Sequence, residues 1–159
     1  HNAYSEELKD KFCSALHLAL HDSSITKVII TGKGRSFCSG GDLNEFGSVK
    51  DPANAHLSRT TRSAGSLLAK LTDKTHFKVH GACIGAGIEL TAFSNQITAQ
   101  QNSFFQLPEV GMGLIPGAGG TVSINKRIGR RRAAFMALSG TRIDSETALK
   151  WGLIDELLT

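Results

Sequence analysis

The middle of the chain reads Gly81-Ala82-Cys83-Ile84-Gly85-Ala86-Gly87-Ile88-Glu89-Leu90, and a second segment follows as Leu107-Pro108-Glu109-Val110-Gly111-Met112-Gly113-Leu114-Ile115-Pro116-Gly117-Ala118-Gly119-Gly120-Thr121. Each segment sets one carboxylate among apolar residues and glycines. A carboxylate that loses hydration favours its neutral form, which suits it to proton transfer near neutral pH. Two such groups in one cleft can divide acid and base roles. We therefore predict a site built on Glu89 and Glu109, whose carboxyls share one proton.

Glycine-rich joints are the second feature of the sequence. Three of them are predicted to run from a strand through a glycine turn into a helix: Gly40-Gly41-Asp42, Gly85-Ala86-Gly87 and Gly117-Ala118-Gly119-Gly120. The first N–H groups of a helix lack a partner within the helix, and they bind anions or developing negative charge. Two converging helix starts would hold one carbonyl oxygen as an oxyanion hole. Ordinary turn chemistry is the alternative for any one joint taken alone.

Several other chemistries find no support in the sequence. The third glycine of a dinucleotide fingerprint is replaced by Leu90, and neither a GxxxxGK[ST] loop nor a GxSxG turn occurs. The histidine pairs 17/21 and 76/80 have no carboxylate cluster or cysteine pair beside them. We interpret them as structural and predict no metal site.

Composition is typical of a soluble globular protein of one domain, with 159 residues, 40% hydrophobic and 20% charged. The longest apolar run falls short of the ~20 residues that span a bilayer, so no membrane span is expected. The three cysteines include no CxxC pair. We interpret them as reduced thiols, which favours the cytoplasm and leaves an organellar matrix open.

A basic cluster carries much of the formal charge of +4, because five cations occur in the seven residues Lys126-Arg127-Ile128-Gly129-Arg130-Arg131-Arg132. Solvated helix ends are the favoured interpretation. Contact with a cofactor phosphate or with another subunit is the second. Nucleic acid is the third and is not expected, because no aromatic residues interleave the cluster.

Hydrophobic periodicity predicts helices over residues 5–20, 63–71, 119–128, 131–138 and 145–151, and a further helix that carries Glu89. A helix is also predicted near Asp42. Strands are predicted over 27–31, 77–80, 97–99 and 104–105, and a mobile surface loop over 47–62. Strands that alternate with helices indicate an α/β fold with parallel pairing.

With these motifs in place, the chain resembles the crotonase superfamily, the enoyl-CoA hydratases and isomerases. The resemblance runs from Asn2 to about Leu157, in the family's order. Its pieces are the strand at 28–32, the segment Ser36-Phe37-Cys38-Ser39-Gly40-Gly41-Asp42-Leu43, the two glycine segments, and Gly140-Thr141-Arg142-Ile143 with Ala148, Gly152 and Leu153.

The resemblance implies a crotonase-like spiral core of repeated ββα units, here one domain over 1–159 that is truncated at both ends. It implies an acyl-CoA thioester substrate, whose carbonyl oxygen meets the N–H groups of Gly41 and Ala86. Glu89 and Glu109 would hold a water molecule and catalyse its addition. Further substrate-binding positions carried over from the family are Ser39, Asp42, Leu43, Gly85, Pro108 and Gly117. No cofactor is implied beyond the coenzyme A of the substrate, and the family suggests a homotrimer or hexamer.

Three functions follow as hypotheses from the resemblance. Hydration of a 2-enoyl-CoA leads, because both glutamates are present. Isomerisation or another crotonase-type reaction is the alternative, since moving a double bond needs only one positioned carboxylate. A noncatalytic acyl-CoA- or RNA-binding member is the third. The chain departs from the family pattern at Ala86, usually glycine, and at Ser94-Asn95, commonly Cys-Asp.

Overall fold

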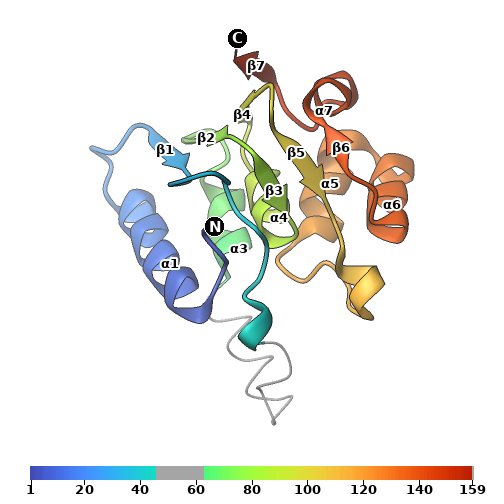
Figure 1. Ribbon diagram of the computed structural model, residues 1–159. Coiled ribbons are helices and arrows are strands. Elements are labelled where there is room, and N and C mark those ends of the chain that lie inside the picture. Colours follow the sequence, from blue (N-terminus) through green and yellow to red (C-terminus); the bar gives the residue numbers. More distant parts are fainter. Residues whose placement is uncertain (46–62, 159) are drawn as a thin grey trace.

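A computed structural model describes residues 1–45 and 63–158 (Figure 1). In these residues the strands form two sheets at the centre of the molecule, with α1 on one side and α5 to α7 on the other. The predicted loop over 47–62 lies outside the described residues. None of the described helices is long and apolar enough to cross a membrane.

The first sheet is entirely parallel and has the order β1 (Val28–Thr31), β2 (Thr75–Val79), β4 (Gln96–Gln100) and β7 (Glu156–Leu158). Phe77 of β2 lies opposite Ile97 of β4, and both side chains are almost fully buried. The three central residues of β4 are all buried. This pattern is typical of a parallel strand that is covered on both faces.

The second sheet has the order β3 (Ala82–Ile84), β5 (Phe104–Gln106) and β6 (Ile143–Asp144). A strand of the first sheet is followed within a few residues by one of the second and then by a helical segment, as in β2–β3–α4. Cys38 and Cys83 form an isolated β-bridge through their backbones, which brings the segment after β1 beside β3. These repeats form the ββα spiral of the crotonase fold, which confirms the predicted α/β class.

Two of the helices begin at a serine that caps them. The Ser5 hydroxyl accepts the N–H of Leu8 at the start of α1, and Ser63 accepts that of Ser66 at the start of α3. The helices are α1 (Glu6–His21), α3 (Ala64–Lys70), α4 (Ala86–Thr91), α5 (Gly120–Ile128), α6 (Arg130–Ser139) and α7 (Ser145–Trp151), with 3-10 helices η1 (Leu43–Glu45) and η2 (Glu109–Met112).

Helices α1, α3, α4, α5 and α6 pack in succession, each against the next. Helix α4 is buried along its whole length. Its neighbours are α3 on one side and α5 on the other, and its first residue follows β3 directly. A polar side chain on α4 therefore lies in the core of the protein, close to the end of β3.

The structure corrects parts of the sequence prediction. Pairing is not parallel throughout, because the chain turns after α6 at Gly140 (φ 61°) and β6 runs antiparallel to β5. The third glycine joint follows η2 rather than a strand, and the described residues after Asp42 form only a 3-10 helix. Strands β3, β6 and β7 were not predicted, because two or three residues are too short for a periodic pattern.

Truncation of a central strand residue should destabilise the fold. We expect Ile97→Ala to lower the free energy of unfolding by about 2–5 kcal/mol, because Ile97 is 0% exposed and its loss leaves a cavity. The matched control is Ile29→Ala on β1, where the side chain is 52% exposed and the change should stay within about 0.5 kcal/mol. Denaturant titration measures both, and equal losses would contradict the placement of the core.

Candidate active site

Glu89 lies in the first turn of α4 and is 2% exposed. Its Oε2 accepts two backbone hydrogen bonds, from the N–H of Ala118 and from that of Gly120, each 2.8 Å long. Gly119 between these donors has φ 115°, a left-handed conformation that favours glycine. The third glycine joint therefore wraps around the Glu89 carboxylate at the start of α5.

Glu109 comes from the other glycine segment and is 9% exposed. Its Oε1 lies against Gly85, so closely that a Cβ on Gly85 would stand 2.5 Å away. Gly85 also has φ 50°, so both its conformation and its surroundings require glycine. The other oxygen of Glu109, Oε2, is buried and has no hydrogen-bond partner. An acid oxygen in this state is unusual unless a substrate or water completes it.

Both carboxyls have raised pKa values. Burial raises the pKa of Glu89 to about 7, opposed by the hydrogen bonds from the loop and assisted by the charge of Glu109. Burial likewise raises the pKa of Glu109. Desolvation favours a proton on Glu89, whereas the two N–H groups favour its charged form. Glu109 has no such donors from the loop, so the effect of burial on its carboxyl is not offset in this way. We therefore assign one proton to the pair rather than to either residue.

Two backbone N–H groups, those of Gly41 and Ala86, come from the first two glycine joints. A backbone β-bridge pairs Cys38 with Cys83 in parallel, and the two chain segments run on from there to Gly41 and to Ala86. The carbonyl of Gly40 and the N–H of Asp42 bond to Tyr4, so the Gly41 N–H points away from Tyr4.

Ala86 is the first residue of α4, so its N–H has no partner within the helix. Neither it nor the Gly41 N–H donates to another described residue. The Gly40 Cα is 3.7 Å from the position of a Cβ on Gly85. The first two glycine joints thus lie side by side at Gly40 and Gly85.

The remaining predicted positions differ in their surroundings. Asp42 is half-buried and caps η1, because its Oδ1 accepts the backbone and side-chain N–H groups of Asn44 at 3.0 Å. Leu43 is 67% exposed. Ser39 is exposed and its N–H donates to the carbonyl of His1. These side chains lie beside Gly41 in the chain and leave its N–H unobstructed by hydrogen bonds.

Pro108 and Gly117 flank the site without donating to it. Pro108 is half-buried and lines a groove of about 330 Å³ between η2 and the end of α6. Gly117 is exposed, and the donors that hold Glu89 are its neighbours Ala118 and Gly120. The sequence singled out the third glycine joint, which does contact Glu89, but through Ala118 and Gly120 rather than Gly117. The conformation of the turn decides which N–H groups reach the carboxylate.

Four of the five cations in the basic cluster are exposed at the ends of α5 and α6, as the favoured interpretation of solvated helix ends expects, and Arg127 is the exception. Arg127 has a side chain only 12% exposed and pairs with Asp155. Arg132 donates to the carbonyl of Trp151 and lies over its ring at 5.5 Å. Two of the five cations thus hold the C-terminal elements together. The described residues contain no group of three potential metal ligands.

Comparison with known proteins agrees with the fold. The family model described as enoyl-CoA hydratase/isomerase matches residues 1–159. The fold is that of the crotonases, and the chain belongs to the enoyl-CoA hydratase/isomerase family.

Individual relatives carry out more than one reaction. The chain is 35% identical over 156 residues to the 2,3-dehydroadipyl-CoA hydratase of Escherichia coli K12, covering 98% of the chain and 60% of the relative. It is 31% identical over 158 residues to the 1,2-epoxyphenylacetyl-CoA isomerase of the same organism, covering 96% and 60%. An enoyl-CoA hydratase structure from Shewanella pealeana superimposes with a TM-score of 0.90 at 27% identity, covering 99% and 60%. The chain thus spans about three fifths of the length of these relatives.

The buried carboxyl of Glu89 predicts how stability depends on pH. Its pKa rises from 4.5 to about 7 on folding, so its contribution to stability is full below 4.5 and is lost as pH rises through about 7. Glu89→Gln keeps an acceptor for the two N–H groups but has no proton to lose. We expect it to remove the fall of about 3 kcal/mol in the free energy of unfolding that the carboxyl causes as pH rises.

Denaturant unfolding between pH 4 and pH 8 tests this expectation. The control is Glu146→Gln at the exposed start of α7, which should follow the pH dependence of the unsubstituted protein. A Glu89→Gln variant with an unchanged pH slope would show that the carboxyl is not desolvated.

Proposed function

We propose that this protein hydrates the 2,3 double bond of a 2-enoyl-CoA thioester. The observation that carries the proposal is the pair of buried carboxyls, Glu89 and Glu109, beside two unpartnered N–H groups. Coenzyme A belongs to the substrate, and the mechanism needs no other cofactor. We extend the proposal to assembly as a homotrimer or hexamer, which rests on the family resemblance alone.

The N–H groups of Gly41 and Ala86 would bind the thioester carbonyl oxygen. Attack by water at the β-carbon moves electron density onto that oxygen, so the donors stabilise the enolate-like state more than the ground state. Both donors are backbone groups. The backbone β-bridge between Cys38 and Cys83 and the start of α4 therefore fix them in place. They need no reorganisation as the charge develops.

The two carboxyls would then move the protons. Glu89, with its charged form supported by two N–H donors, takes a proton from water as the oxygen bonds to the β-carbon. Glu109, whose Oε2 has no protein partner, delivers a proton to the α-carbon. One molecule of water has been added across the double bond. The pair still holds one proton, now on the other carboxyl, so the reaction is reversible.

Isomerisation of the double bond is the second candidate, and one relative is named an isomerase. An isomerase moves a proton between two carbons of the substrate and needs one positioned carboxylate. Here two carboxyls are buried together, and the second has no evident structural partner. This favours hydration, in which one group handles the water proton and the other the carbon proton.

Removal of either carboxyl should abolish most of the turnover. We expect Glu89→Gln and Glu109→Gln each to lower kcat by on the order of 10²–10⁴-fold, because each change removes a group that transfers a proton. The measurement is the loss of conjugated enoyl-thioester absorbance, with Glu146→Gln as the control. Undiminished turnover in both variants would refute the assigned roles.

Isotope incorporation separates the two candidate reactions. In heavy-oxygen water a hydratase yields a 3-hydroxyacyl product that carries the label, whereas an isomerase yields an unlabelled product with a shifted double bond. Mass spectrometry of products from 2-enoyl and 3-enoyl thioesters therefore identifies the reaction.

A further inference from the structure

One face of α5 bonds to α4 at three successive points. The N–H of Gly120 donates to the Glu89 carboxylate at 2.8 Å, and the Ser123 hydroxyl donates to the Glu89 carbonyl at 2.6 Å. One turn further on, Nη2 of Arg127 donates to the carbonyl of Ser94, just beyond α4, at 2.9 Å. The spacing of three and then four residues places these groups on the same side of the helix.

The contact through Ser123 is specific to Glu89. Helix α4 ends at Thr91, and the N–H of Phe93 donates to Leu90, so the Glu89 carbonyl is left for the serine. Ser123 itself is 1% exposed. Both the side chain and the main chain of Glu89 are therefore held by α5.

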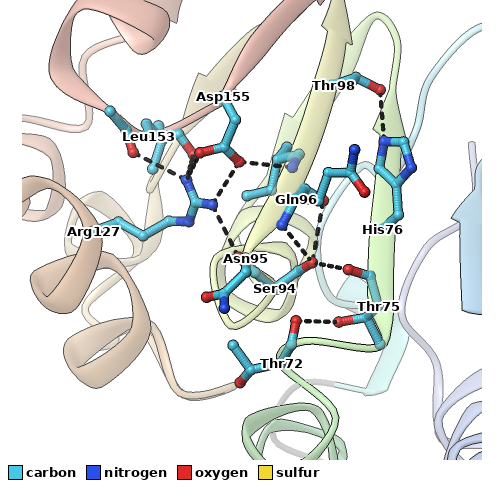
Figure 2. A network of polar contacts seen from close by, with 12 residues as sticks. Thr72, Thr75, His76, Ser94, Asn95, Gln96, Thr98, Arg127, Leu153 and Asp155 are labelled. Atoms are coloured by element: carbon cyan, nitrogen blue, oxygen red, sulfur yellow. Dashed lines mark hydrogen bonds and ion pairs between the residues drawn. The ribbon is translucent and has the colours of Figure 1, made fainter. Parts of the chain in front are cut away.

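Arg127 anchors the far end of α5. Its guanidinium pairs with Asp155 at 2.7 Å and donates to the carbonyls of Gly152 and Leu153 at 3.0 and 3.1 Å. Figure 2 shows it between Asp155 and Ser94, which lies three residues after the end of α4.

The partners of Arg127 are themselves fixed to the first sheet. Asp155 also accepts the N–H of Ile97 on β4, and the Ser94 hydroxyl donates to the Thr75 carbonyl on β2. The guanidinium thus ties the end of α5 to the sheet and to the end of α4.

The start of α5 lies against the Glu89 side chain. A Cβ on Gly120 would stand 2.6 Å from Cγ of Glu89, so only glycine allows this close approach. Movement away would lengthen the hydrogen bonds from Ala118 and Gly120. Ile124 and Ile128 pack α5 into the core, and the hydrogen bonds of Ser123 and Arg127 attach it to α4 and to the segment that follows α4.

We propose that Ser123 and Arg127 are positioning residues for Glu89, which fix α5 on α4 so that the N–H groups at its start hold the carboxylate in place. This rests on the proposed catalytic role of Glu89. Neither residue touches the reacting atoms. Their effect passes through the two N–H bonds, which favour the charged form of Glu89 against the effect of burial. Weaker bonds would raise the pKa of Glu89 further and misplace the base.

The test compares Ser123→Ala and Arg127→Lys with a matched control, Arg132→Lys. Arg132 is also an arginine that bonds to a main-chain carbonyl, but it joins α6 to α7 and does not contact α4. The readouts are kcat, KM and the titration of the Glu89 carboxyl, followed by carbon NMR on glutamate-labelled protein and assigned with Glu89→Gln. The chain is used together with any sequence that naturally adjoins it.

We expect the Glu89 titration to move to higher pH in Ser123→Ala and Arg127→Lys and to stay in place in Arg132→Lys. We expect kcat to fall about ten- to hundredfold with KM little changed, as for a slightly misplaced base. Ser123→Ala removes a single hydroxyl, so it keeps the test decisive if Arg127→Lys does not fold.

The outcomes separate this proposal from the proposed function. An unmoved Glu89 titration in folded Ser123→Ala overturns the positioning role, whatever the turnover of the variant. A titration that moves in a protein without hydratase activity supports positioning and refutes the proposed reaction. Equal shifts in Arg132→Lys would show a general effect of packing and would also overturn the proposal.

Discussion

The carboxylate of Glu89 sits in the core of the protein, where burial opposes its charge and two backbone N–H groups support it. This balance constrains everything around it. The turn before α5 needs glycine at Gly119 for its left-handed backbone, and Gly120 leaves the space that the carboxylate fills. Helix α4 must be buried to desolvate the acid. Helix α5 must begin at Gly120, so that the N–H groups at its start reach the Glu89 carboxylate.

The same relation between glycine and carboxylate recurs at Glu109. Gly85 lies between β3 and α4, turns the chain from one to the other and leaves the volume that the Glu109 carboxyl occupies. The glycine-rich segments are therefore not phosphate cradles in this chain. At Gly40 and Gly85 they let two backbone segments approach closely. At Gly85 and Gly120 they leave room for the carboxyls of Glu109 and Glu89. One sequence feature thus serves both the donors and the acids.

The pairing of Glu89 with Glu109 was predictable, because each lies in an apolar segment beside a glycine turn. The assignment of Gly41 and Ala86 as donors rests on the resemblance to the crotonases, and the β-bridge between Cys38 and Cys83 brings the two chain segments that carry them together. Arg127 was not predictable as a buried residue. A run of cations is ordinarily solvated, and its partner Asp155 lies 28 residues away and meets it only after β7 has joined the sheet.

The cost of burying Glu89 is itself informative about its role. A glutamine at this position would accept the same two N–H groups without the desolvation of a charge, so a residue needed only for structure would gain from that replacement. Natural proteins keep such destabilising groups chiefly where chemistry uses them. Glu109, with a buried oxygen that no protein group satisfies, carries the same implication. Two buried acids whose pKa values are both raised by burial are more readily explained by proton transfer than by packing.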